Sequence, residues 1–383
     1  MRLLDRYVLR NFLEPFLICF FGFIAIWLIF DLYDNSHDFL EYHVRLKNIA
    51  IFYLAQLPAV ILLSVPVALL LALLFSLSKM SRHNEIISML TAGRSVYRVL
   101  LPLVIIGILA SAGCMVLNWE WAPHAEASKA TFMERFRKGD RGDTRIVEGY
   151  LFRNRLNNRT WYVRRFQPLA VQLDGVHITE QDAEGNTLAK WYAARAVYNP
   201  DKSWTLNRGM HVTFNKAGDI VENDSFATPA DDKKALGYRT VKNWSETPWR
   251  IAAGQFQAQN LSVEELRDYL KFNSDFPEVQ LASFRTNLAD RYAFPLSCLV
   301  VIFIAAPLGI VYSRRGVLAG VAGSIFIFFA MIMIRYFFLA MGKGSHMKPN
   351  MAAWLPDVAF MFIGLVLLYF RSSNREFKLA FWK

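Results

Sequence analysis

The sequence predicts an α-helical membrane protein with six transmembrane helices, arranged three plus three, and an inserted all-β domain of jelly-roll-like type. Two observations predict this class. Six apolar segments each reach the length of about 20 residues that a helix needs to cross a bilayer. Between the third and the fourth lies a long polar stretch with short β-rich runs. The apolar segments cover approximately residues 12–33, 50–78, 98–120, 291–312, 317–341 and 352–371.

This pattern divides the chain into three parts. Residues 1–121 hold the first three helices, with a short extra helix at about 82–93. Residues 122–280 form the β-domain, and residues 281–383 hold the last three helices and a tail. The first apolar segment lacks a small-x-small cleavage site, because bulky residues around Trp27 stand where one would fall. We therefore expect a retained anchor rather than a cleaved signal peptide.

Composition limits the class of protein. The chain is 54% hydrophobic and carries a formal net charge of +11. Its basic residues flank the apolar segments and do not cluster on one soluble face, which argues against nucleic-acid binding. The three cysteines, Cys19, Cys114 and Cys298, all lie in apolar segments. The polar domain therefore has no cysteines with which to form a disulfide or a CxxC metal site.

Lysine and arginine positions predict the orientation in the membrane. The short loops on one side offer only Arg45, Lys47, Lys343 and Lys348. The richer side belongs in the cytoplasm by the positive-inside rule, together with both termini. The polar insert is then extracytoplasmic, which means periplasmic in a bacterium with two membranes, and the chain is a multi-pass inner-membrane protein. The richer side carries Arg2, Arg6, Arg10, Lys79, Arg82, Arg94, Arg98, Arg314, Arg315, Arg371, Arg375, Lys378 and Lys383.

The polar insert is predicted to be β structure. Its β-rich stretches are separated by turn signals at a regular spacing, which is typical of a sandwich, jelly roll or barrel. Trp161, Trp191, Trp204 and Phe214 could fill its interior, either as plain core or as the lining of a binding lumen. The β-rich stretches are residues 160–166, 171–179, 188–198 and 203–214.

Two short helices are predicted outside the apolar segments. Ser262 and Glu265 form an S-x-x-E capping box ahead of a helix at about 263–272. In the loop between the second and third apolar segments, Ser81 can cap a helix that Gly93 ends.

The loop helix has an apolar face. Ile86, Met89 and Leu90 lie on one side by their i, i+3, i+4 spacing. Such a helix can rest on lipid or bind a protein partner, and the pattern favours neither.

No catalytic motif is present. The sequence lacks a P-loop, HExxH, GxSxG and any paired metal-ligand spacing. We therefore predict no catalytic residue, no metal and no cofactor. If the protein is powered, the power comes from a partner or from an ion gradient.

Basic residues near the outer ends of the apolar segments are candidates for binding lipid phosphate. Snorkelling to the head groups is the plainer alternative. Asp31 and Asp34, which close the first segment, are predicted to be solvated. Gly316 and Gly320 form a GxxxG that permits close helix contact, within one subunit or with a second. The candidate lipid-binding residues are Lys129, Arg135, Arg285, Arg291 and Arg335.

Several short motifs carry a family resemblance that covers essentially the whole chain. They are Leu4-Asp5-Arg6-Tyr7 at the start, Leu57-Pro58 and Val65-Pro66-Val67-Ala68-Leu69-Leu70 in the second segment, Glu85 through Ala92-Gly93 in the loop, Pro295-Leu296 and Ala306-Pro307-Leu308-Gly309 in the fourth segment, and Trp354-Leu355-Pro356 in the sixth. In this order the chain resembles the LptF/LptG family (YjgP/YjgQ type), permease subunits of the lipopolysaccharide export transporter. The run Trp119-Glu120-Trp121-Ala122-Pro123 leans towards LptG.

The resemblance implies a set of partners. Two such permeases would pair and dock on two copies of a cytoplasmic ATPase similar to LptB. The β-domain would be a periplasmic jelly roll that receives lipopolysaccharide and hands it to an LptC/LptA-like bridge. The loop helix would be the coupling helix that enters a groove of the ATPase. Its candidate coupling residues are Arg82, Glu85, Ile86, Met89, Leu90 and Gly93.

We therefore expect a permease subunit of an ATP-driven exporter that extracts lipopolysaccharide, or a similar amphiphilic lipid, from the inner membrane. The chain would be no enzyme itself, since ATP would be hydrolysed in a separate subunit. The alternative is a membrane-anchored periplasmic binding or scaffold protein without a transport cycle, which would tolerate loss of the loop helix. An ion-driven transporter would place ionisable residues at mid-membrane, and the apolar segments nearly lack them. A membrane hydrolase is disfavoured by the absent motifs.

Overall fold

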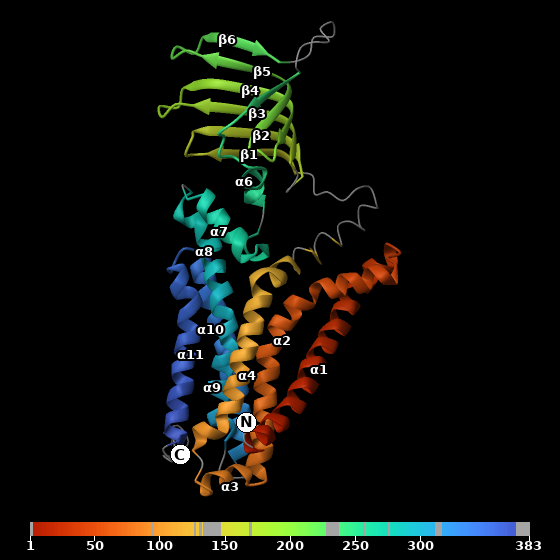
Figure 1. Cartoon of the computed structure of the whole chain (residues 1–383), viewed down its shortest axis with the longest axis vertical. Helices are drawn as coiled ribbons and strands as arrows, with labels where there is room; N and C mark the ends of the chain where they lie inside the picture. Colours follow the sequence, from red (N-terminus) through yellow and green to blue (C-terminus); the bar gives the residue numbers. More distant parts are fainter. Residues whose placement is uncertain are drawn as a thin grey trace. The chain divides into compact units, whose positions relative to one another are not determined.

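The structure is a computed structural model of the whole chain. It describes residues 3–93, 95–125, 128–129, 132, 147–167, 171–226, 237–255, 257–274, 276–310 and 316–372. The chain divides into two compact units. One is a helical bundle made of Met1–Arg137, Ala258–Arg267 and Glu278–Lys383, and the other contains the β-sheet and is made of Lys138–Gln257 and Asp268–Pro277 (Figure 1).

Six helices in the described part of the chain are long and apolar enough to cross a membrane, so the predicted three-plus-three pattern is confirmed. The fourth crossing is composite, because a short 3₁₀ turn joins two helices into one path from Glu278 to Gly309. A π-helical turn likewise extends the third. The bundle contains α1 (Leu3–Glu41), α2 (Leu46–Arg82), α3 (Glu85–Thr91), α4 (Val96–Val116), η1 (Leu117–Trp121), α8 (Glu278–Ala293), η4 (Phe294–Leu296), α9 (Ser297–Gly309), α10 (Gly316–Lys343) and α11 (Pro349–Ser372).

Helices α2 and α9 form the centre of the bundle. Leu69, Leu73 and Leu77 of α2 are fully buried, as are Val300 and Ala305 of α9. A helix that is apolar on every side has no face suited to water, so it can be enclosed by other helices within the bundle. Helix α2 continues through two internal prolines and changes direction along its length (Figure 1).

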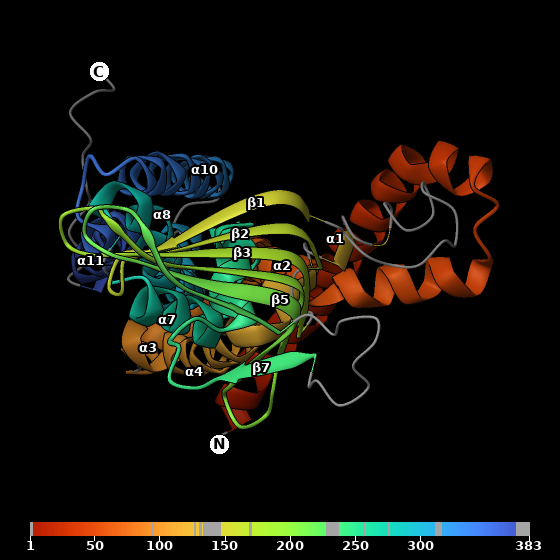
Figure 2. The ribbon, with the colours of Figure 1, turned by 90° about the horizontal axis from the view of Figure 1, so that it is seen from above.

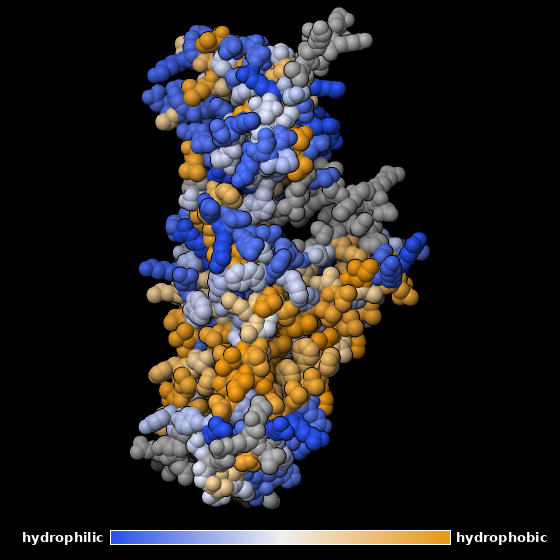
Figure 3. Space-filling view, in the orientation of Figure 1, coloured by the Kyte–Doolittle hydropathy of each residue, from blue (hydrophilic) through white to orange (hydrophobic). Residues whose placement is uncertain are grey.

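Helix α1 lies at the outside of the bundle and is apolar where it is exposed. Ile18, Phe21 and Ile29 each expose more than half of their surface. Figure 3 shows hydrophobic residues gathered over the helical bundle on the face in view. An exposed apolar patch of this extent on a multi-helix bundle is the surface that lipid covers.

The inserted domain is one antiparallel sheet of seven strands, which confirms the prediction of an all-β insert. Consecutive strands pair in a meander from β1 to β6, and their ribbons curve together (Figure 2). Strand β5 has two partners on one side, because β7 pairs with its first half and β6 with its second. The strands are β1 (Val147–Asn154), β2 (Arg159–Phe166), β3 (Gln172–Gln181), β4 (Thr187–Tyr198), β5 (Trp204–Phe214), β6 (Ile220–Ser225) and β7 (Tyr238–Val241).

One face of the sheet forms the core of this unit. Trp161 and Trp204 are completely buried there, and Trp191 joins them. Ile251 of α6 (Pro248–Ala252) packs on the same cluster, so the interior is filled by the chain itself. The prediction for Phe214 was wrong. It lies at the end of β5 beside a register shift, outside that cluster, and Lys190 covers its ring.

The segment after the sheet returns the chain towards the bundle. It contains two short 3₁₀ turns, η2 (Ala253–Gln255) and η3 (Ala258–Asn260), followed by α7 (Val263–Phe272). The predicted capping box is confirmed. The Ser262 amide donates to Glu265 Oε2 at 2.8 Å, and the Glu265 amide donates to Ser262 Oγ at 3.3 Å.

Candidate functional site

The helix α3 occupies the loop that was singled out in the sequence. Its start differs from the prediction: Ser81 does not cap it but lies buried within α2, which runs on to Arg82. Met80 explains the extension, because its fully buried side chain keeps the last turn of α2 on the core. The chain then turns at Asn84, whose left-handed φ of 59° precedes α3. Gly93, with φ of 80°, follows the end of the helix in the left-handed conformation typical of that position.

The apolar face of α3 packs on the bundle itself. Ile86 is 1% exposed and Met89 8% exposed, both within the main core cluster, and Leu90 packs beside them. The sequence left lipid and a protein partner as alternatives for this face. In the structure, the face packs on the helices of the same chain. The side that remains open is polar, and Arg82, Ser88 and Gly93 are exposed on it or next to it.

Glu85 is the acidic residue of this surface. It lies in the first turn of α3, where the positive end of the helix dipole favours a negative charge. Its Oε2 atom is buried and has no hydrogen-bond partner in the described part of the chain. Buried acceptors are nearly always paired in native proteins. The residue as a whole is half-exposed. A rotation of the carboxylate therefore brings this unpaired oxygen to the surface, where it can accept a hydrogen bond from a donor of another molecule.

The candidate lipid-binding residues do not form one cluster. Lys129 pairs with Asp31 of α1, and Asn35 donates to the same aspartate at 2.9 Å. Asp31 is therefore buried rather than solvated as predicted, because two donors replace its water. Arg135 lies outside the described residues.

Two arginines at the start of the fourth crossing differ in their surroundings. Arg285 donates to Glu278 at 2.8 Å, and its side chain remains 41% exposed. Arg291 donates to Asn118 Oδ1 at 2.8 Å and to the backbone oxygen of Gln259. Arg285 is thus accessible to a ligand, whereas Arg291 ties the fourth crossing to η1.

Arg335 is the largest departure from the sequence-based expectation. It neither snorkels nor faces lipid, since it is 4% exposed within the bundle. Its guanidinium pairs with Asp357 of α11 and Asp290 of α8, and it lies over the Phe294 ring at 5.1 Å. A buried charge needs a partner in close geometry. Both aspartates supply it, and together with Arg335 they join three helices in a buried ionic triad.

Glycines allow close helix contacts at positions that the sequence reasoning missed. A Cβ added to Gly364 of α11 would lie 2.8 Å from the Phe303 backbone of α9, and one added to Gly107 of α4 would lie 2.1 Å from Ile302. Neither glycine belongs to a GxxxG. Gly316 and Gly320 fall in the first turns of α10, and their role at a helix interface stays a prediction.

In the sheet, Trp191 and His211 stack with ring centroids 3.6 Å apart. Arg239 lies above the same indole at 5.3 Å. Burial lowers the pKa of His211, and the neighbouring Arg239 charge lowers it further. The neutral imidazole is therefore the form that this packing favours.

One group of potential metal ligands occurs within the described ranges. His37, Asp38 and Glu41 bring ligand atoms within 4.8 Å of one another on the surface of α1. His37 and Glu41 are exposed, and acidic groups of this kind are common without an ion. We assign no metal to it.

No curated protein matches the sequence. The pattern now assembled is a six-span bundle with a short helix between the second and third crossings and an antiparallel β-domain between the third and fourth. The family model described as lipopolysaccharide export system permease LptF/LptG matches residues 6–369, which is nearly the whole chain. This protein therefore belongs to the LptF/LptG family of lipopolysaccharide export permeases.

Proposed function

We propose that this chain is one permease subunit of an ATP-driven exporter, which extracts lipopolysaccharide from the inner membrane and passes it to a periplasmic bridge. Family membership supports the cargo and the transport role. One observation carries the coupling step: the apolar side chains of α3, Ile86 and Met89, are part of the bundle core. Close-packed interiors transmit displacement rather than absorb it. A force on the outer face of α3 therefore acts on α2, against which α3 packs, and through it on the core of the bundle.

The force would come from a separate, LptB-like ATPase dimer that docks on the polar side of α3. Glu85 supports this assignment, because its half-exposed carboxylate has one unpaired oxygen, which can turn outwards and accept from a basic donor of the ATPase. Arg82 and Gly93 flank the same surface, at the ends of α2 and α3.

Orientation follows the basic flanks. Both termini and α3 would lie in the cytoplasm, and the β-domain would lie in the periplasm. A second permease of the same family would complete the transport path, with Gly316 and Gly320 as candidate contacts. Lys129 and Arg285 remain the better candidates for lipid phosphate, since 38% and 41% of their side chains are exposed.

The β-domain would receive the lipid and hand it to an LptC/LptA-like bridge. Each methylene exposed to water costs about 0.8 kcal/mol, so a lipid with several acyl chains needs a shielded path through the periplasm. The tryptophan-rich face of the sheet is the apolar surface available for this role. Because Ile251 packs on that surface, cargo would replace contacts of α6 as it enters.

The test of the coupling step is the charge reversal Glu85→Arg. Losing the acceptor and adding a like charge at a charged contact is expected to weaken ATPase binding by about 2–5 kcal/mol. The measurement is the amount of ATPase that copurifies with the permease, together with lipid release on ATP addition. Glu85→Gln, which keeps the shape and one oxygen, should lose less.

Glu41→Arg serves as the matched control. It reverses an exposed charge at the far end of α1, where the Glu41 carboxylate pairs with His37. Copurification of the ATPase with Glu85→Arg at the wild-type level would contradict the proposed coupling role of α3. If deletion of α3 also left lipid transfer intact, the chain would act as a membrane-anchored scaffold instead.

A further inference from the structure

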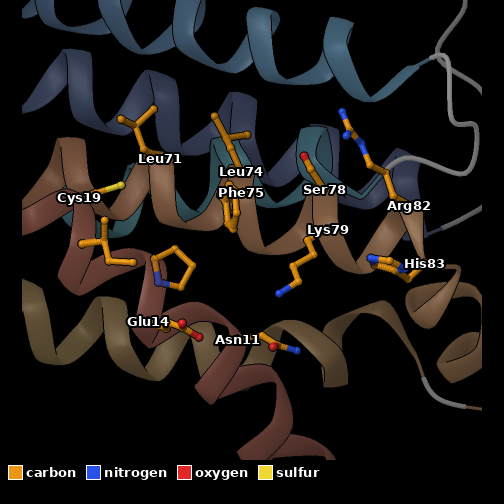
Figure 4. A pocket seen from close by; sticks show the side chains of 12 residues that line it. Asn11, Glu14, Cys19, Leu71, Leu74, Phe75, Ser78, Lys79, Arg82 and His83 are labelled. Atoms are coloured by element: carbon orange, nitrogen blue, oxygen red, sulfur yellow. The ribbon is translucent and has the colours of Figure 1, made fainter.

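A cavity of about 860 Å³ lies between α1 and α2, where α1 begins and α2 ends (Figure 4). Its size falls within the range of about 300–1,000 Å³ that is usual for small-molecule sites. Two walls form it. Asn11, Glu14 and Ile18 project from α1, and Phe75 and Lys79 project from α2. Among its lining residues Arg82 also flanks the proposed docking surface of α3, whereas the others have no part in the functions proposed above.

The lining changes character along α2. Leu71, Leu74 and Phe75 come first and make one end apolar. Lys79 and Arg82 follow at the end of the same helix and make the other end polar. Cationic side chains at the end of a membrane-spanning helix lie at head-group level. The polarity of the cavity therefore matches that of an amphiphilic molecule, with an apolar part inside the membrane and a charged part at its surface.

Several polar groups of the cavity lack a partner. Ser78 is 8% exposed, and its hydroxyl makes no hydrogen bond to any described residue. Lys79, Arg82 and Glu14 form no ion pair within the described ranges. The two cations also complement the negative end of the α2 dipole. That role explains their charge but neither the cavity nor the unpaired Ser78 hydroxyl.

We propose that this cavity binds a membrane glycerophospholipid whose head carries an ammonium group beside its phosphate. Lys79 and Arg82 bind the phosphate, and Glu14 on the facing wall accepts the ammonium. Ser78 donates a hydrogen bond to the phosphate after its buried hydroxyl rotates into the cavity. An acyl chain runs over Leu71 and Phe75. Two cations and one carboxylate match the charges of such a head group more closely than they match a purely anionic one.

The bound phospholipid is distinct from the exported cargo. It would lie at the end of α2, two residues before α3 begins. By filling the space between α1 and α2 it would brace the helix that carries the coupling element. This consequence depends on the proposed coupling role of α3, whereas the binding site itself does not.

The test uses the full-length chain in nanodiscs that contain phosphatidylethanolamine with a photoreactive acyl chain. Crosslinks are mapped by mass spectrometry to residues 11–19 and 71–83. We expect Lys79→Gln to reduce the crosslink yield about tenfold, the effect of losing one charge-assisted hydrogen bond. Ser78→Ala should reduce it less, because its hydroxyl is neutral. Arg10→Gln is the matched control, since it removes an exposed cation from the same part of α1 that does not line the cavity.

Three results would overturn the site itself, and a fourth would overturn the role of Glu14. Unchanged crosslinking in Lys79→Gln would show that the cavity does not hold the head group. Displacement by soluble glycerophosphoethanolamine would assign the site to a free phosphate compound instead of a lipid. Crosslinks to a second permease chain in place of lipid would make the cavity a subunit interface. Equal capture of phosphatidylglycerol would overturn the role of Glu14. ATPase copurification, measured on the same samples, separates failure of this site from failure of the coupling proposal.

Discussion

Arg335 illustrates how a charge is accommodated inside a membrane bundle. Removing an ion from water costs several kcal/mol, and this cost is offset only when partners of opposite charge meet it in good geometry. Asp357 is completely buried and Asp290 partly so, and each pairs with the guanidinium. Their three helices are therefore joined at a point where lipid alone could not satisfy the charge.

Replacing Arg335 tests this triad. Arg335→Met is expected to lower the free energy of unfolding by about 3–5 kcal/mol, because Asp357 would remain buried without its partner. Adding Asp357→Leu should recover part of that loss, since an apolar side chain needs no counter-charge. Thermal unfolding in detergent measures both. Arg285→Met, which breaks an exposed pair, should change stability by no more than about 1 kcal/mol; equal losses for the two arginines would contradict the triad.

His211 gives the β-domain a pH dependence. Its pKa in the folded state is lowered by burial and by Arg239, so the unfolded chain binds a proton more readily than the folded one. The stabilisation is present above the unfolded pKa of about 6.5 and is lost as the pH falls below it. Tryptophan fluorescence should show a lower unfolding temperature at about pH 5 than at about pH 7.5.

His211→Gln should remove much of this dependence in that window. Asp182 and Asp201 also have lowered pKa values, through hydrogen bonds from Asn186 and Ser203 respectively. Their stabilisation is lost only below about pH 4, which keeps the two effects apart. If the unfolding temperature changed with pH equally in the variant and in the unchanged protein, the effect would belong to other groups.

At the scale of elements, β5 determines which strands form one edge of the sheet. Its partner changes from β7 to β6 near Arg208 and Gly209. Arg208 adopts a φ of 51°, as at a bulge, and its amide donates to the Gly237 oxygen. Gly209 lies so near β4 that an added Cβ would be 1.8 Å from the Tyr192 carbonyl oxygen. A side chain at this point would separate the two strands.

Gly209→Ala is therefore expected to destabilise the β-domain by about 3 kcal/mol, the upper end of the usual range for overpacking, because a backbone atom cannot move aside. Hydrogen exchange of the β4 and β5 amides measures the loss locally. The control, Gly113→Ala in α4, meets no atom within 4 Å and should stabilise that helix by about 0.5–1 kcal/mol. Full protection of β4 and β5 in Gly209→Ala would contradict the close contact.

At the scale of the whole molecule, the proposed transport path depends on how the chain is oriented in the membrane. Coupling through α3 requires α3 and the β-domain to lie on opposite sides, since a cytoplasmic ATPase and a periplasmic bridge cannot share one. Six crossings would place both termini on one side, and the basic flanks predict the cytoplasm for that side.

Cysteine labelling tests the orientation. Lys216→Cys, in the exposed turn between β5 and β6, should react with an impermeant maleimide in intact spheroplasts. Ser88→Cys, exposed on α3, should react only after permeabilisation. The unchanged chain, whose Cys114 and Cys298 are buried, gives the background. The reverse pattern would overturn the orientation and with it the proposed path of the lipid.

Features that depend on neighbours along the chain could be predicted from the sequence. The six spans follow from the length of each apolar run, the β-domain from its turn signals, and the capping box from Ser262 and Glu265 alone. One such prediction failed. Ser81 is a residue type that can cap a helix, but the burial of the neighbouring Met80 keeps Ser81 within α2.

The tertiary structure decided what depends on residues far apart in sequence. Arg335 found its partners 45 and 22 residues away, and periodicity carries no information about such pairs. The apolar face of α3 packed on its own bundle, β5 acquired two partners, and the cavity formed where α1 meets α2. Hydropathy determines which segments leave water, whereas the close packing of specific side chains determines which of them meet.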